Sequence, residues 1–549
     1  MLPVCGGFAA EAGVALFSGS RGWLGEMLRP MRGVFREALL MSLFINVLAL
    51  ATPVFTLQVY DRVVFYGGVT TMWGLVIGMM LVLAFDYVLR QARGRLLQRV
   101  ALRLDVEVGR KLFDKVLALP LRQLESKPTA FWMTLFRDAN QVRDVFSGPT
   151  AVLLVDLPFA LLALVLTYVI APAIAWVLPL MLAVYAVLAW RSGVVMDRLS
   201  NGERVAGQGR DAIIAEMLAG RSTVKALALD AHMRKLWEER HAEVIERGLV
   251  RGVTNDMYMT LGQSLALFAT VLLTTVGAFA VLDQSVSIGG LIASGMLSSK
   301  IIAPFNQLFG IWRSLTGARQ AWERLGQVFA ATEERRTSAI EFDRPKGDIV
   351  LDGISFHYGG REPLVVDSVR VRIGAPGLHG VIGRNGSGKS TLLKLIHGLY
   401  PPLAGRVLID GADISQFTRH ELARWFGYVP QDCTLFAGSI RDNIVRGLEL
   451  SDDDILRAAR AAGVHDFVAD MPDGYATDVG EGGQRLSAGQ RQRIALARAL
   501  VADPPVLLLD EPSSNFDRQA EEELARTLAE LAKTRNIVLV THSPALLAA

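Results

Sequence analysis

The sequence predicts a membrane protein of two parts, an all-α domain with six membrane spans followed by an α/β domain. Of its 549 residues, 51% are hydrophobic, and the excess lies in long apolar runs before about residue 310. The remainder alternates short apolar runs with amphipathic stretches, which is typical of α/β domains. We expect an N-terminal cytoplasmic segment at 1–35, a transmembrane domain at 36–325, a linker at 326–347 and the second domain at 348–549.

Six apolar runs are long enough to cross a membrane. A bilayer core of ~30 Å needs about 20 apolar residues in a helix. One such run could be a buried helix of a soluble protein, but six of them, several without any charge, favour membrane spans. The predicted spans are 37–60, 70–89, 149–170, 172–190, 257–282 and 288–312.

Arginine and lysine gather in two long loops, one between the second and third spans and one between the fourth and fifth. On the opposite side only Arg62 is basic. The positive-inside rule therefore places both termini and both long loops in the cytoplasm, and we expect the loops to be helical extensions of the spans. The net charge of only +3 argues against a nucleic-acid partner.

Three ionisable residues, Asp86, Asp156 and Lys300, fall inside the predicted spans. Such groups are costly in hydrocarbon and usually face a bundle interior or a wet cavity. They could line a substrate pathway that contains Lys300. Alternatively, they could form an internal ion pair that fixes helix register, or lie close enough to the cytoplasmic end to be hydrated. We favour this second interpretation, because Asp86 and Asp156 both lie towards cytoplasmic ends of spans.

The second domain contains a glycine-rich loop that fits the pattern G-x-x-x-x-G-K-[ST]. An apolar run at 378–382 predicts a strand before it, and 391–396 predicts a helix after it. Glycines let the backbone curl around phosphates, and a helix N-terminus adds partial positive charge. The sequence therefore predicts a P-loop NTPase domain that binds ATP. The candidate nucleotide-binding residues of this loop are Gly383, Arg384, Asn385, Gly386, Ser387, Gly388, Lys389, Ser390 and Thr391.

An apolar run that ends in two acids, 506–511, suits a buried parallel strand with its ligands at the carboxyl end. We expect Asp510, together with the Ser390 hydroxyl, to hold Mg²⁺, and Glu511 to polarise the attacking water. By itself the run could be an ordinary strand with an acidic turn. A P-loop earlier in the chain favours the catalytic interpretation.

A third motif is Leu486-Ser487-Ala488-Gly489-Gln490, which leads into an amphipathic stretch rich in arginine. Such a helix start can offer N–H groups and a hydroxyl to a phosphate. On physical grounds alone it could equally be an N-cap followed by a solvated basic face.

Together these motifs resemble the ABC transporter ATPases, whose signature LSGGQ reads LSAGQ here. The resemblance implies that Tyr358 stacks on adenine, that Gln431 reaches Mg²⁺ and the water, and that His542 contacts the γ-phosphate. It makes Glu511, His542 and Gln431 the catalytic set, and Ser390, Gln431 and Asp510 the Mg²⁺ ligands. It also implies that Ser487, Ala488, Gly489 and Gln490 contact an ATP held by a partner chain, and that Asp517 belongs to the D-loop, at 514–517.

In this family two ATPase domains stack head to tail, so that each ATP lies between the P-loop of one and the signature of the other. This chain has one of each, which implies a homodimer, with a heterodimer as the alternative. Spans that precede the ATPase, with long cytoplasmic loops, are similar to the exporter type. The segments 124–146 and 218–233 are then the expected coupling helices.

A narrower resemblance is to the type I secretion exporters, through the residues at 45–53, 58–63, 155–159 and 480–483. It implies ATP-driven export of unfolded protein across the bacterial inner membrane. The partners would be a secreted protein substrate, a periplasmic adaptor, an outer-membrane channel and membrane lipid.

Two alternatives stay open: an exporter of peptides, lipids or drugs, and a regulatory or inactive nucleotide-binding copy. Glu511 and His542 argue against the inactive copy. Ala488 and the end of the sequence at Ala549 keep it open, because the family normally continues with further strands and a helix. We therefore expect a C-terminally shortened ATPase domain.

Overall fold

The computed structural model describes residues 29, 32–146, 148–334, 337–338, 342–359 and 363–548. Most of the expected N-terminal segment and part of the expected linker therefore lie outside the described residues. The chain divides into two compact units. One comprises Met1–Leu117 with Lys127–Ala331, and the other comprises Ala118–Ser126 with Thr332–Ala549.

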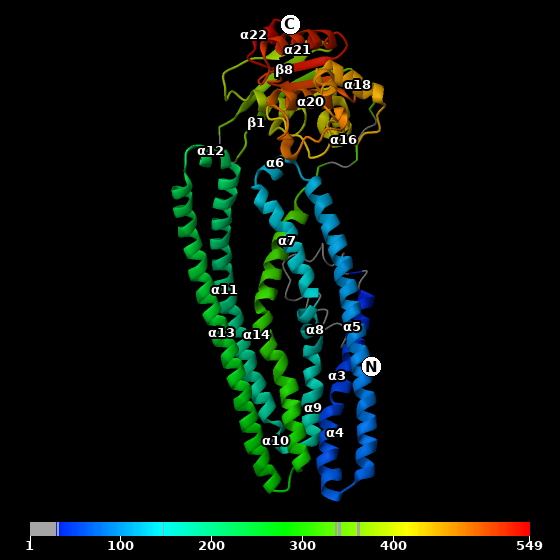
Figure 1. Cartoon of the computed structure of the whole chain (residues 1–549), viewed down its shortest axis with the longest axis vertical. Helices are drawn as coiled ribbons and strands as arrows, with labels where there is room; N and C mark the ends of the chain where they lie inside the picture. The colour runs from blue at the N-terminus through cyan, green and yellow to red at the C-terminus, as the bar shows by residue number, and fades with distance from the viewer. Residues whose placement is uncertain are drawn as a thin grey trace. The chain divides into compact units, whose positions relative to one another are not determined.

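The first unit is all-helical, and its described residues contain six helices long and apolar enough to cross a membrane, as predicted. The second to fifth spans run on beyond their predicted ranges, because the long loops continue as helix (Figure 1). The helices are α3 (Arg32–Ala49), α4 (Ala51–Gln58), α5 (Val69–Leu117), α7 (Thr129–Phe146), α8 (Gly148–Asp156), α9 (Ala160–Ile170), α10 (Pro172–Ala175), α11 (Val177–Ala219), α12 (Arg221–Ala226), α13 (Asp230–Leu282) and α14 (Ile288–Ala330).

Two spans change helix type part-way. The first ends in a π-helical segment, Val59–Val64, which places Asp61 beside the start of α14. There the Asp61 carboxylate accepts hydrogen bonds from the Ser287 hydroxyl (2.6 Å) and from the backbone N–H of Gly289 (3.0 Å). The third span has a 3₁₀ turn at Leu157–Phe159, where Pro158 lacks the N–H that a regular helix would use.

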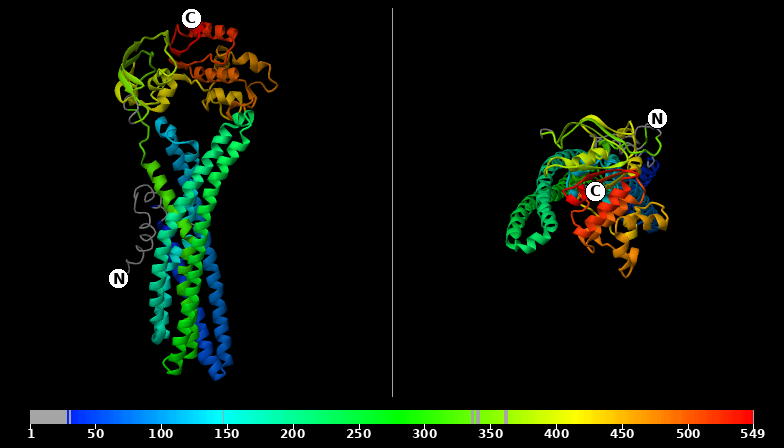
Figure 2. Two further views of the ribbon diagram at one scale, coloured as in Figure 1. Left: turned by 90° about the vertical axis from the view of Figure 1, so that its left-hand side faces the viewer. Right: turned by 90° about the horizontal axis from the view of Figure 1, so that it is seen from above.

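Helices α11 and α13 lie side by side along much of their length and are joined through α12 (Figures 1 and 2). The buried Tyr185 of α11 donates to the Gly262 carbonyl of α13 at 2.7 Å. Helix α11 also approaches α14 closely, since a Cβ on Gly193 would lie 2.2 Å from the Trp312 ring. The short helix α12 falls within the predicted coupling segment 218–233. The other predicted segment, 124–146, is mostly α7, and a separate short helix, α6 (Leu121–Glu125), precedes it.

Two of the three ionisable residues in the spans form ion pairs, as favoured. Asp156 pairs with Arg93 at 2.7 Å, and Asp86 pairs with Arg90 one turn along the same helix at 2.7 Å. Arg93 is only 5% exposed and also donates to the Ser42 hydroxyl. This contact ties α3, α5 and α8 together.

The second unit is the predicted α/β domain, built on two four-stranded sheets. One sheet pairs antiparallel in the order β2-β1-β4-β5, with β1 (Ile349–Phe356), β2 (Val366–Ile373), β4 (Ala404–Ile409) and β5 (Ala412–Asp413). The other is parallel in the order β3-β8-β7-β6, with β3 (Gly377–Val381), β6 (Phe426–Val429), β7 (Val506–Asp510) and β8 (Asn536–Val540).

Helices follow the parallel strands, as the right-handed crossovers of a parallel sheet require. The residues of β7 and β8 are all buried, which explains why both read as continuous apolar runs. The helices of this unit, besides α6, are α15 (Lys389–Ile396), α16 (Arg419–Trp425), α17 (Ile440–Val445), α18 (Asp452–Ala461), α19 (Val464–Ala469), α20 (Ala488–Leu500), α21 (Arg518–Leu531) and α22 (Pro544–Leu547).

Candidate nucleotide site

The four parallel strands end at one edge of their sheet, and the predicted catalytic residues follow these ends. The P-loop follows β3, Gln431 comes two residues after β6, Asp510 closes β7, and His542 comes two residues after β8. Side chains at the carboxyl ends of neighbouring parallel strands converge on one crevice. The fold thus brings together residues that are up to about 160 positions apart in the sequence.

The P-loop has the backbone that its glycines predict. Gly386 and Gly388 have φ of +79° and +88°, which residues with a side chain rarely adopt. A Cβ on Gly388 would also lie 2.9 Å from the Val365 carbonyl oxygen. The Lys389 ammonium donates to the carbonyls of Gly383 (2.9 Å) and Arg384 (3.0 Å). The loop therefore holds its one lysine over its own concave backbone, at the N-terminus of α15.

Asp510 is suited to a metal ion. It is 2% exposed, and its Oδ1 has no hydrogen-bond partner among the described residues. Burial raises the pKa of this carboxyl above its ordinary value, although the Ser390 hydroxyl, by hydrogen bonding to it, lowers the pKa. A buried carboxylate with an unused oxygen, beside a hydroxyl and near a phosphate-binding loop, is a donor set that fits Mg²⁺.

Glu511 has a left-handed backbone, with φ of +48°. For a residue other than glycine this conformation costs about 1–2 kcal/mol, and such strain is often found at functional sites. The Glu511 N–H donates to the Val540 carbonyl at 2.9 Å. Its carboxylate accepts from the Gln431 amide at 3.4 Å, so the two residues predicted to handle the water are adjacent.

Tyr358 borders the site on the side of α15. Its hydroxyl lies 2.7 Å from the Thr391 hydroxyl, and its ring, 43% exposed, packs edge-on against Phe356 and Tyr400. The Tyr400 hydroxyl donates to Glu125 of α6. Burial, reinforced by Glu125, raises the pKa of Tyr400. No motif in the sequence predicts that α6 contacts this aromatic cluster.

The signature motif begins a helix, as predicted. Ser487 is the N-cap of α20, with a reciprocal capping box to Gln490. A Cβ on Gly489 would lie 3.0 Å from the Asn515 carbonyl oxygen, which places the motif against the predicted D-loop. Asp517 caps α21 by accepting from the Ala520 N–H. The resemblance places one signature motif and one P-loop on each ATP. Among the described residues of this chain, no hydrogen bond joins its own signature motif to its own P-loop.

Gln492 is the residue of this region that sequence reasoning missed. It is 2% exposed, and its amide donates to the Glu511 carbonyl at 2.8 Å. A signal for it exists: Gln492 shares a helix face with Ala495, Leu496 and Ala499, all buried. A glutamine on a buried helix face requires polar partners.

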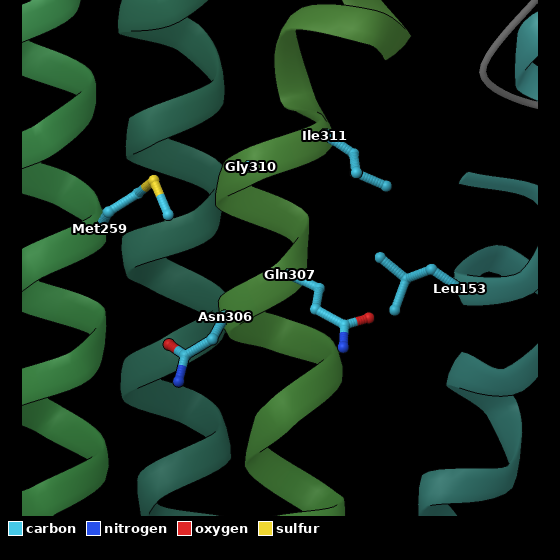
Figure 3. Close-up of a pocket in the computed structure, with 6 residues that line it drawn as sticks. All are labelled: Leu153, Met259, Asn306, Gln307, Gly310 and Ile311. Atoms are coloured by element: carbon cyan, nitrogen blue, oxygen red, sulfur yellow. The ribbon is translucent and has the colours of Figure 1, made fainter. Parts of the chain in front are cut away.

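The membrane unit contains a cavity of about 490 Å³. Figure 3 shows Gln307 of α14 pointing towards Leu153 of α8, while Asn306 lies on the side of Met259 of α13. Gly310 and Ile311 complete the lining, which contains no charged residue. The Asn306 amide oxygen has no partner within the described part of the chain.

The fold and the site together define an ATP-driven transporter in which a multi-pass membrane region and an ATPase are fused. The family model described as "ABC transporter transmembrane region" matches residues 35–305, and the one described as "ABC transporter" matches residues 366–514. The chain therefore belongs to the ABC transporters. It is a membrane protein that binds ATP and hydrolyses it as a transport ATPase.

Among its relatives is the alpha-hemolysin translocation ATP-binding protein HlyB of Escherichia coli. It is 32% identical over 521 residues, which are 95% of this chain and 74% of that protein. The toxin RTX-I translocation ATP-binding protein of Actinobacillus pleuropneumoniae is 32% identical over 529 residues, with the same coverage. A bacterial Atm1-family ABC exporter, solved with ATP bound, has the same fold, with a TM-score of 0.82 at 22% identity over 93% of this chain and 91% of that one.

Proposed function

We propose that this chain is the inner-membrane ATPase of a bacterial type I secretion system and that it exports unfolded protein. The observation that carries the proposal is 32% identity, over 95% of the chain, to proteins described as the translocation ATP-binding proteins of alpha-hemolysin and of toxin RTX-I. The complete set of ATPase residues at one sheet edge supports an active exporter rather than a regulatory copy.

The roles of the site residues belong to this proposal. Ser390, Asp510 and Gln431 hold Mg²⁺, which when bound neutralises charge that develops on the phosphate oxygens. Glu511 polarises the attacking water, which its contact with Gln431 supports. His542 contacts the γ-phosphate. Tyr358 stacks on adenine, which its exposed ring permits.

The chain acts as a homodimer in the proposal. The separation between signature and P-loop within one chain supports this, since a second copy would supply Ser487, Ala488, Gly489 and Gln490 to each ATP. The ATPase domain, 348–549, lies in the cytoplasm, joined by the linker 326–347 to the membrane domain 36–325 in the inner membrane. A periplasmic adaptor and an outer-membrane channel complete the export route.

ATP turnover in nanodiscs tests the ATPase roles. We expect Mg²⁺-dependent turnover that Glu511→Gln lowers by about 100-fold or more. The matched control is Glu523→Gln, on the exposed face of α21, which should keep wild-type turnover. Turnover by Glu511→Gln at the wild-type rate would overturn the assigned role.

Stimulation of the same ATPase tests the substrate class. Chemically unfolded alpha-hemolysin, the protein that one relative translocates, should raise turnover several-fold, and its folded form should not. Equal stimulation by short peptides, lipids or apolar drugs would favour the alternative exporter classes.

A further inference from the structure

Gln492 joins the signature helix to the catalytic acid. Its Nε2 donates to the Glu511 carbonyl (2.8 Å) and to the Ser514 hydroxyl (3.3 Å). Its Oε1 accepts from the backbone N–H and the side-chain amide of Asn515, both at 3.3 Å. Since one partner is a backbone carbonyl and another a backbone N–H, only one orientation of the amide satisfies both.

These contacts hold a strained part of the backbone. Glu511 has φ of +48°, and its N–H is bound to the Val540 carbonyl. Its carbonyl accepts from Gln492 and from the Ser514 N–H (3.2 Å). Both backbone polar groups of Glu511 are therefore fixed, and α20 provides one of the fixing contacts. A left-handed residue other than glycine persists only where its surroundings impose that conformation.

The contact between α20 and the D-loop extends beyond Gln492. Gly489 approaches Asn515 so closely that a Cβ would lie 3.0 Å from its carbonyl oxygen. The Arg493 guanidinium lies over the Phe516 ring, 5.3 Å from its centroid. Three successive contact positions on α20 thus face the segment 511–516, so a displacement of the start of α20 would be transmitted directly to it.

We propose that Gln492 is a positioning residue that couples the two ATP sites of the dimer. The inference rests on the proposed function, in which the start of α20 contacts the partner's ATP while Glu511 acts on the chain's own ATP. Engagement of the signature at one site then sets, through the Gln492 amide, the backbone of Glu511 at the other. Hydrolysis at one site thereby depends on closure of both.

The chemistry of the side chain supports coupling rather than packing. A residue that only fills space between a helix and a loop is best apolar, because a buried amide is favourable only with its hydrogen bonds made. Here both ends of the amide are bound: the donor end meets Glu511 and Ser514, and the acceptor end meets Asn515.

Three variants of the full chain in nanodiscs separate these contacts. Gln492→Met keeps the approximate volume and removes all four hydrogen bonds. Gln492→Glu keeps an acceptor for Asn515 but has no donor for Glu511. Asn515→Ala keeps the contact with Glu511. Gln519→Met is the matched control, since Gln519 lies on the exposed face of α21, where its amide donates to Glu523.

The measurements are kcat, KM and the Hill coefficient for ATP turnover, with nucleotide binding and thermal midpoint on the same preparations. We expect wild type to show a Hill coefficient above 1. Gln492→Met and Gln492→Glu should lower kcat by about 10-fold or more, the loss expected from one misplaced catalytic contact. Their KM should stay within about 3-fold and their Hill coefficients should approach 1. Asn515→Ala should fall between them and wild type.

Wild-type kcat in Gln492→Met, an unchanged Hill coefficient in both Gln492 variants, or a wild-type Hill coefficient of 1 would each overturn the coupling. A drop in kcat that only follows a lower thermal midpoint, without a change in the Hill coefficient, would also overturn it. The proposed function fails separately, when Glu511→Gln keeps its turnover. If Glu511→Gln is inactive and the Gln492 variants behave as wild type, only the coupling is lost.

Discussion

Cys433 lies two residues after Gln431 and reports on the environment of that loop. Its thiol donates to the Pro430 carbonyl, and burial raises its pKa from 9.0 to about 11, a shift that Arg498 opposes and Asp432 reinforces. At pH 8 a thiol of pKa 9 is about 10% thiolate, whereas one of pKa 11 is about 0.1% thiolate. Because only the thiolate reacts, alkylation of Cys433 should be roughly 100-fold slower than that of an ordinary thiol.

The assay is the alkylation rate with N-ethylmaleimide between pH 7.5 and 10, in a chain whose other cysteine, Cys5, is replaced by serine. The dependence on pH separates the raised pKa from simple shielding. A thiol of pKa 11 should react about 10-fold faster with each pH unit up to pH 10. The control is Glu523→Cys in a Cys433→Ser background, whose rate should level off near pH 9. A similar plateau for Cys433 would refute the reasoning, however slow the reaction.

Thermal unfolding in nanodiscs tests three further expectations. Asp156→Ala leaves the buried Arg93 without its carboxylate and should lower the free energy of unfolding by about 3 kcal/mol. The double variant Arg93→Leu with Asp156→Leu leaves no buried charge unpaired and should be more stable than Asp156→Ala. If the two are equally unstable, the unpaired charge is not the cause of the loss. Asp61→Ala removes the acceptor of two hydrogen bonds at the start of α14 and should lower the free energy of unfolding by about 2 kcal/mol. Asp61→Asn keeps one acceptor oxygen and should lower it less. Equal thermal midpoints for the two variants would contradict this. Because burial raises the folded-state pKa of Asp510 above 3.8, the folded nucleotide-free protein loses stability as the pH rises above 3.8 and this carboxyl ionises. Asp510→Asn should therefore raise the thermal midpoint at pH 7 while abolishing turnover, and a lower midpoint would refute the sign.

The parts of the fold that the sequence predicted well are those with strong local signals. The run 506–511 was expected to be a buried strand ending in acids, and β7 is Val506–Asp510. The helix expected after the P-loop at 391–396 is α15, which begins two residues earlier, at Lys389. Hydrophobic length and continuity alone suffice for such elements. They do not determine strand order, and the antiparallel sheet β2-β1-β4-β5 was not predicted.

The hydrophobic pattern of the spans does not predict the irregular segments within their helices. The π-helical segment Val59–Val64 has no proline or glycine to announce it. What distinguishes it is a tertiary contact, since Asp61 binds the start of α14. The 3₁₀ turn at Leu157–Phe159 could have been suspected from Pro158, because a proline inside a helical pattern removes a hydrogen bond. The first departure is therefore associated with a tertiary contact and the second with a local proline.

The candidate site likewise contains residues that local motifs predict and residues that they do not. Motifs predicted the residues of the P-loop, and the structure gives that loop the left-handed glycines such a loop needs. Gln492 carries no motif of its own, and its importance depends on partners 19 to 23 positions away in the sequence. The structure adds a difference in environment between the neighbouring acids. Asp510 is buried with a raised pKa, whereas the Glu511 carboxylate accepts a hydrogen bond from Gln431.

That separation follows from one backbone angle. Asp510 ends a strand in which every residue is buried, so its carboxylate lies where an ion with fixed ligands can be held. Continuing the strand by one residue would place the next carboxylate on the opposite face of the sheet. The φ of +48° at Glu511 breaks this alternation, and the Glu511 carboxylate lies beside Gln431, which follows the neighbouring strand β6. Gln492 binds the Glu511 carbonyl directly after this angle, so we expect loss of the Gln492 amide to displace Glu511 even though both acids are unchanged.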